Sequence, residues 1–76
     1  MQKEDFLKNF ANQFDETDAS KISLQTLFKD LDEWSSLISL SIIAMCDEEY
    51  SVKVTGDDIQ KAQIVEDLFQ LVKSKI

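Results

Sequence analysis

Residues 34–50, WSSLISLSIIAMCDEEY, carry the clearest helical pattern in the chain. At about 100° per residue, the side chains from Ser36 to Glu49 separate into two stripes. One stripe is mostly apolar and is expected to pack on a core; it consists of Ser39, Ile42, Ile43, Cys46 and Tyr50. The sequence therefore predicts a helix over 36–49, with Cys46 as a small buried hydrophobic residue and not a reactive thiol.

The opposite stripe of this helix is unusual for a surface in contact with water. It consists of Leu37, Ser41, Ala44 and Glu48, and it is flanked by Ile38, Leu40 and Met45. A solvated face normally carries Lys, Glu or Gln, and only some of these apolar residues can cover the core. We interpret Leu37, Ser41, Ala44, Asp47 and Glu48 as a docking strip for a partner; the alternative is apolar surface without a function.

The charge of the chain limits its partners. Fifteen Asp and Glu face eight Lys, with no Arg or His, for a formal charge of −7. Such a chain repels nucleic acid and acidic membrane surfaces, and it attracts basic protein patches. The acids Asp47, Glu48 and Glu49 crowd a helix C-terminus, where each costs about 0.3–1 kcal/mol. This placement favours a basic protein partner, although the charge could also serve only solubility.

Length and composition exclude several classes of protein. Seventy-six residues are expected to form one domain, residues 1–76, around a modest core. Without His and with a single Cys, the chain offers no imidazole base, no internal disulfide and no Cys-based metal cluster. The most apolar stretch, residues 37–46, is about half as long as a membrane span. We expect a soluble, cytoplasmic monomer without membrane insertion.

The rest of the chain predicts an all-α fold. Apolar residues at helical spacing predict helices over about 3–15 and 64–75, and Thr55 with Asp58 resembles a capping box for a short helix over 56–61. The long connection between the first two helices is expected to turn its apolar residues inward, with room for one helical turn; these residues are Ile22, Leu24, Leu27, Phe28 and Leu31. The expected architecture is a small four-helix bundle with a short third helix.

Ser36 at the start of the 36–49 helix has two interpretations. Its hydroxyl group could cap the helix by accepting a hydrogen bond from a free backbone N–H. The same position suits a phosphate ester, because the helix dipole and the free N–H groups favour negative charge. Asp30, Asp32 and Glu33, which precede the helix, fit the same dipole.

The sequence around Ser36 resembles that of acyl and peptidyl carrier proteins. Trp34-Ser35-Ser36-Leu37 is similar to the Trp-Asp-Ser-Leu form of their attachment motif. The similarity continues in register through residues 27–31 before the motif, 40–50 after it, and 57–59 and 64–68 further on. The resemblance implies a four-helix carrier fold in which Ser36 receives a 4′-phosphopantetheine arm from coenzyme A.

The family resemblance also implies a function and partners. The chain would be a freestanding carrier and not an enzyme, holding an acyl or aminoacyl group as a thioester on the arm at Ser36. Its partners would be a phosphopantetheinyl transferase and the enzymes that load and process the cargo, which would bind the docking strip through basic patches. Fatty acid, polyketide, amino acid and peptide remain open as the cargo.

Two positions depart from the family pattern. Ser35 replaces the Asp that helps the transferase recognise its substrate, so modification could be slower, need a dedicated transferase, or not occur. Ala62 stands where relatives often have a large apolar residue, and no Ser or Thr caps the helix that follows. We therefore expect a less tightly held junction between the third and fourth helices.

Three alternatives follow from the residues. The first is an unmodified acidic helical adaptor with a carrier-like fold, which Ser35 favours and Ser36 disfavours. The second is a calcium-binding protein. Its loop needs Gly at the sixth position and Glu at the twelfth, whereas a loop that starts at Asp15 has Ser20 and Thr26 there. The third, a self-contained enzyme, is the weakest, because no partner base accompanies the carboxylates.

Overall fold

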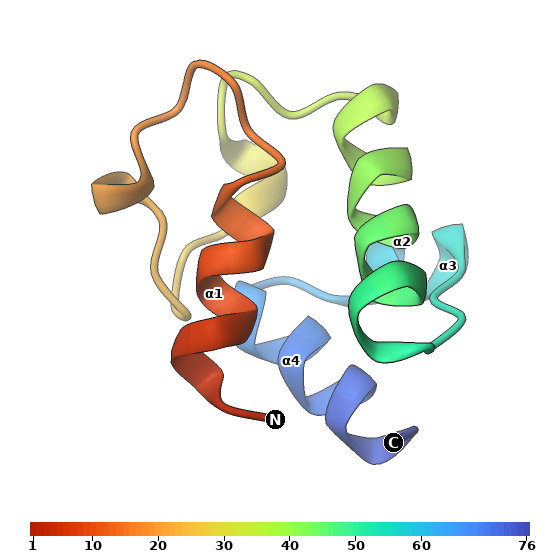
Figure 1. Cartoon of the computed structure of the whole chain (residues 1–76). Helices are drawn as coiled ribbons and strands as arrows, with labels where there is room; N and C mark the ends of the chain where they lie inside the picture. The colour runs from red at the N-terminus through yellow and green to blue at the C-terminus, as the bar shows by residue number, and fades with distance from the viewer.

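Four α-helices and two short 3₁₀ turns form the secondary structure in the computed structural model, which describes residues 1–76 (Figure 1). In chain order the elements are α1 (Lys3–Ala11), η1 (Ala19–Lys21), η2 (Phe28–Asp30), α2 (Ser36–Tyr50), α3 (Gly56–Lys61) and α4 (Val65–Ser74). The chain contains no strand, so the predicted all-α class is confirmed. No helix has both the length and the apolar character needed to cross a membrane.

The helices begin and end close to the predicted positions, except at the end of α1. This helix stops at Ala11 and not near residue 15, and the backbone then tightens into two turns that bring Phe14 into the core. Helix α2 ends because Ser51 adopts the left-handed conformation, with φ of 56°. Helix α3 has the predicted bounds. Thr55 and Asp58 form the predicted capping box, in which each backbone N–H donates to the other residue's side chain, at 3.0 and 3.1 Å.

The helices pack in pairs around one core. Helix α1 contacts α2 and α4, while the short α3 packs against α2. Figure 1 shows both chain termini at the lower end of the view and the long α1–α2 connection along the upper left. The molecule measures 30 × 23 × 20 Å.

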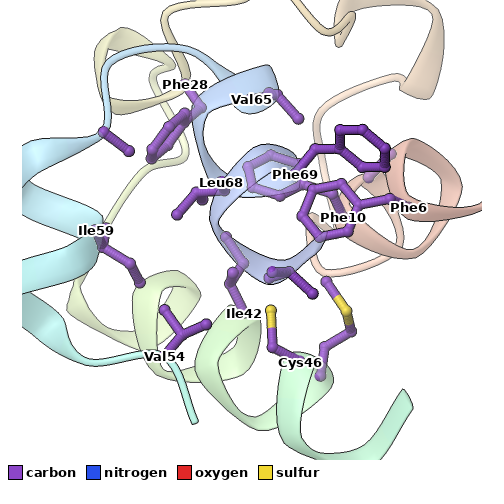
Figure 2. Close-up of a cluster of buried hydrophobic side chains, with 14 of the residues drawn as sticks. Phe6, Phe10, Phe28, Ile42, Cys46, Val54, Ile59, Val65, Leu68 and Phe69 are labelled. Atoms are coloured by element: carbon purple, nitrogen blue, oxygen red, sulfur yellow. The ribbon is translucent and has the colours of Figure 1, made fainter. Parts of the chain in front are cut away.

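The core consists entirely of apolar side chains, many of them aromatic (Figure 2). Phe6 of α1 packs edge-on against Phe69 of α4, with ring centroids 5.8 Å apart, and Phe10 packs in the same way on Phe28, at 5.5 Å. Phe28 belongs to the α1–α2 connection, so this connection contributes directly to the core. Such edge-to-face aromatic pairs add about 0.5–1.5 kcal/mol each beyond the area that they bury.

The inward turn predicted for the α1–α2 connection is confirmed for most of its apolar residues. Ile22 and Phe28 are buried, and Leu24 and Leu31 are half-buried against the core. The prediction is wrong for Leu27, which is 53% exposed. The η2 turn starts at Phe28 and directs this ring inward, which leaves the preceding side chain facing water.

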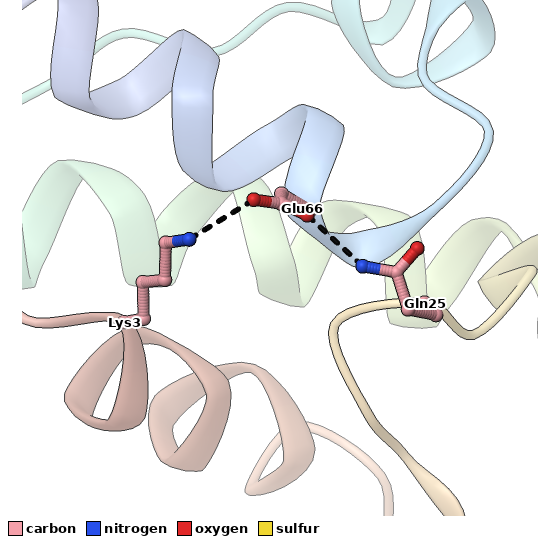
Figure 3. A network of polar contacts seen from close by, with 3 residues as sticks. All are labelled: Lys3, Gln25 and Glu66. Atoms are coloured by element: carbon pink, nitrogen blue, oxygen red, sulfur yellow. Dashed lines mark hydrogen bonds and ion pairs between the residues drawn. The ribbon is translucent and has the colours of Figure 1, made fainter.

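The same connection also holds the start of α4. The backbone N–H groups of Val65 and Glu66, which would otherwise lack partners, donate to the carbonyl oxygens of Thr26 and Leu24, at 3.2 and 2.9 Å. The Glu66 side chain accepts hydrogen bonds from Lys3 and Gln25, at 3.1 and 3.0 Å (Figure 3). Tertiary contacts thus replace a cap on α4.

The junction between α3 and α4 differs from the expectation of a loosely held segment. The carboxylate of Asp67 accepts hydrogen bonds from the backbone N–H groups of Gln63 and Ile64, at 2.9 and 3.1 Å. Ala62 is buried in the core despite its small size. The backbone of the junction is therefore held from within α4, although no Ser or Thr precedes this helix.

Candidate functional site

The adjacent residues Ser35 and Ser36 have different roles in the structure. Ser35 is the N-cap of α2: its hydroxyl oxygen accepts a hydrogen bond from the backbone N–H of Ile38, at 3.3 Å. The interpretation of Ser36 as the helix cap is therefore wrong, because the cap is the preceding residue, Ser35. Ser36 is the first residue of α2 and is exposed, and its hydroxyl group takes part in none of the chain's hydrogen bonds. Of the two hydroxyl groups, only that of Ser36 is free to be modified without loss of the cap.

Trp34 anchors the segment before Ser36 to the core. Its indole ring packs edge-on against the Phe28 ring, with centroids 5.1 Å apart, and its centroid lies 6.4 Å from that of the Phe14 ring. Its backbone N–H donates to the carbonyl oxygen of Leu31, at 3.0 Å. Trp34 thus packs against the core directly before Ser35, the N-cap of α2.

Glu33 makes the densest set of hydrogen bonds in the molecule. One carboxylate oxygen accepts from the backbone N–H of Asp15, at 2.7 Å, and the other from the N–H groups of Glu16 and Thr17, at 3.0 and 2.8 Å. The second oxygen also accepts from the Thr17 hydroxyl group, at 2.7 Å. Partial desolvation opposes ionisation, but these hydrogen bonds outweigh it and lower the pKa of Glu33.

Glu33 therefore does more than the sequence predicted. From the sequence, Glu33 was expected to interact favourably with the dipole of the helix that follows. In the structure, its carboxylate instead accepts hydrogen bonds from residues 15–17 of the α1–α2 connection. These donors lie 16 to 18 residues earlier in the chain, so no local pattern could reveal them. The only local signal is an acid immediately before a helix, a position that acids favour because of the helix dipole alone.

An open groove of about 810 Å³ lies beside Ser36, between α2 and α3. Its α2 wall includes Ser36, Ser39, Leu40 and Ile43, and the opposite wall consists of Thr55, the N-cap of α3, with Gly56, Asp57, Ile59 and Gln60. Lys29 of η2 also lines the groove, and its ammonium group donates to the carbonyl oxygen of Gln60 at the end of α3, at 2.7 Å. The sequence did not predict this groove, because its walls come from three separate segments.

The predicted docking strip lies largely on the surface. Leu37 is 75% exposed, Ala44, Asp47 and Glu48 are also exposed, and Ser41 is half-buried. Leu40, which was placed beside the strip, is 61% exposed and enlarges its apolar part. The other two flanking residues, Ile38 and Met45, are buried, so they belong to the core and not to the strip.

Cys46 and the acidic residues do not form a further chemical centre. Cys46 is fully buried, as predicted, and burial raises the pKa of its thiol to about 11. No group of three or more Cys, Asp and Glu side chains is arranged to hold a metal ion. The features that remain beside Ser36 are its own hydroxyl group and the groove, while the acidic residues of α2 lie at the opposite end of the helix.

Comparison with known proteins assigns no family to the chain. No protein-family model matches it, and a search of the curated proteins finds no match.

Proposed function

We propose that the chain is a carrier protein that holds an acyl or aminoacyl group on a 4′-phosphopantetheine arm attached to Ser36. The observation that carries the proposal is the free, exposed hydroxyl group of Ser36 in the first turn of α2. It combines with the Trp-Ser-Ser-Leu motif, the four-helix architecture and the charge of −7. Under this proposal the chain catalyses nothing and serves other enzymes as a substrate.

The position of Ser36 fits a phosphate ester. The first backbone N–H groups of a helix lack intrahelical partners, and the helix dipole adds partial positive charge at the same end. Ser35 satisfies the N–H of Ile38, and the exposed Ser36 side chain can extend into solvent or along the groove between α2 and α3. When attached, the arm supplies a terminal thiol that carries a carboxylic acid as a thioester.

The surface beside Ser36 fits partners that bind briefly. Leu37 follows the attachment residue directly and is strongly exposed, and the acidic end of the docking strip carries Asp47 and Glu48. A small apolar contact with a charged rim gives fast, salt-sensitive association and easy release. The expected partners are a phosphopantetheinyl transferase and the loading and processing enzymes, each with a basic patch.

A second candidate function is an unmodified acidic adaptor. Ser35 favours it, because the family's Asp at this position helps the transferase recognise its substrate. Ser35 caps α2, as an Asp at this position would. The substitution of Asp by Ser therefore retains the N-cap of the helix. What the substitution removes is a negative charge beside Ser36.

The proposal is tested by intact mass after incubation with coenzyme A and a broad-specificity phosphopantetheinyl transferase. The wild type should gain one phosphopantetheine, and Ser36→Ala should gain none. Ser35→Asn is the matched control, because Asn lacks the hydroxyl group but still caps a helix; it should still be modified. No gain by the wild type, with this transferase and with those of the source organism, would favour the adaptor.

A further inference from the structure

We infer that Glu33 is a positioning residue: its carboxylate clasps the backbone of Asp15–Thr17 and thereby holds the segment that presents Ser36. Four hydrogen bonds of 2.7 to 3.0 Å form this contact, which we call the Glu33 clasp. The role in Ser36 modification rests on the proposed function, whereas the clasp itself does not.

The clasp requires a carboxylate and not merely a side chain of this size. All four partners are donors, three backbone N–H groups and one hydroxyl group, and together they use both oxygens of Glu33. Successive N–H groups that converge on one anion resemble the backbone nests that bind anions in other proteins, and bonds to an ionised acceptor are the stronger kind. An amide at residue 33 would turn an NH₂ group toward at least one donor.

The clasp works together with the neighbouring aromatic contact. Trp34 lies against Phe14, and Glu33 accepts from the N–H of Asp15, so two consecutive residues of one segment bind two consecutive residues of the other. Ser35 then caps α2, and Ser36 follows. Without the clasp the backbone before Ser36 would lose its hydrogen bonds to residues 15–17 and gain freedom, while the Trp34 ring would still pack on Phe14.

A transferase that acts on Ser36 must find this backbone ordered or order it. Because fixing the backbone of even one residue costs free energy, loss of the clasp is expected to lower kcat/KM for modification by roughly tenfold. Most of α2 should be unaffected, because its residues Ile42 and Cys46 are buried in the core and its cap is Ser35. The distinguishing effect of losing the clasp is therefore a local loss of order in the backbone before Ser36.

The test uses four variants of the full chain. Glu33→Gln keeps the side-chain shape and replaces one acceptor by a donor. Asp32→Asn is the matched control, since Asp32 is exposed, adjacent, and engaged in none of the chain's hydrogen bonds. Thr17→Val removes one of the four bonds, and Thr17→Ser should restore it, because Ser keeps the hydroxyl group.

Two readouts separate positioning from general stability. The first is kcat and KM for Ser36 modification under conditions where every variant is folded. The second is amide hydrogen exchange at residues 15–17 and 34–36, measured by NMR. We expect Glu33→Gln to lose about tenfold in kcat/KM and Thr17→Val to lose less. Thr17→Ser and Asp32→Asn should match the wild type. In Glu33→Gln, faster amide exchange should be confined to residues 15–17 and 34–36.

NMR titration gives a further check, because protonation should open the clasp. The amide signal of Thr17, which has no carboxyl group of its own, should follow the protonation of Glu33 in the wild type, and this transition should be missing in Glu33→Gln. The charged groups around the clasp are those of Asp15, Glu16, Asp18, Lys21 and Asp32, and all but Asp15 line the adjoining surface hollow. Asp32→Asn should leave the titration in place.

The outcomes distinguish this inference from the proposed function. Unchanged kcat/KM in Glu33→Gln, or unchanged exchange at residues 34–36, would overturn the positioning role. If no transferase modifies the wild type, the proposed function fails, but the exchange measurement still decides whether Glu33 orders residues 34–36. Unfolding of Glu33→Gln as a whole would also overturn the inference, since it would show a global and not a local effect.

Discussion

Thr17 donates both its backbone N–H and its hydroxyl group to the same carboxylate oxygen of Glu33, at 2.8 and 2.7 Å. This pair joins the early part of the α1–α2 connection to the residue three positions before Ser36. The acceptor is an ionised carboxylate, so we expect this contact to weaken when acid protonates Glu33.

The first prediction concerns acid. Hydrogen bonds lower the pKa of Glu33 in the folded chain, whereas in the unfolded chain this carboxyl takes up a proton near its ordinary value of 4.5. Its contribution to stability is therefore complete above that value and is lost as the pH falls toward the lower pKa of the folded state. We expect the stability difference between wild type and Glu33→Gln to shrink as the pH is lowered from about 7 to about 3.

This difference is measured by urea unfolding, with Trp34 fluorescence as the signal. The difference is more informative than either curve alone, because protonation also relieves the repulsion within a chain of net charge −7. Asp32→Asn provides the control for simple removal of an acid. A difference that stays constant or grows on acidification would contradict the prediction.

The second prediction concerns the cap of α2. Ser35→Ala should lower the free energy of unfolding by about 1 kcal/mol, because the N–H of Ile38 loses its acceptor. Ser35→Asp should keep the cap, add a favourable charge at the helix N-terminus and give the Trp-Asp-Ser-Leu motif of the carrier proteins that the sequence resembles. We therefore expect Ser35→Asp to be at least as stable as the wild type and to be modified faster at Ser36.

Urea unfolding and intact-mass time courses test these two variants. Equal stability of Ser35→Ala and wild type would show that the cap is unimportant. A Ser35→Asp variant that is modified no faster would show that the missing Asp does not limit recognition.

The third prediction compares two exposed leucines, Leu37 of the docking strip and Leu27 of the α1–α2 connection. Substitution of either by Ala should change stability by no more than about 0.5 kcal/mol, because neither side chain is part of the core. Only Leu37→Ala should impair modification by the transferase, by roughly fivefold or more in kcat/KM, as expected for truncation of an interface anchor. Equal effects of the two variants on kcat/KM would argue against the docking strip.

The fourth prediction concerns Cys46. Burial raises the pKa of its thiol from 9.0 to about 11, which lowers the thiolate fraction at neutral pH by about 100-fold, and the folded chain covers the sulfur as well. We expect a chromogenic thiol reagent to react slowly with the native chain and rapidly in urea. Rapid reaction of the native chain would show that α2 separates readily from the core.

Much of the fold follows from local patterns in the sequence. The Thr55 and Asp58 capping box has the predicted hydrogen bonds, and Ile42 and Cys46 lie in the core, as their helical spacing predicts. These features could be predicted because caps and apolar stripes depend on residues within one or two turns of each other. The choice of Ser36 as the attachment residue stays a prediction, and the capping role of Ser35 emerged only from the backbone geometry.

Other features depend on segments that meet only in the folded chain. A helical wheel placed Ile38 and Met45 beside the exposed stripe, but contacts from the other helices bury both. The Glu33 clasp and the groove that Lys29 lines join residues from distant parts of the sequence. Local propensity carries no information about such meetings, because they arise when α1, α2, α4 and the long connection enclose one apolar core. The sequence alone thus yields the helices and the candidate serine, whereas tertiary packing holds that serine in place.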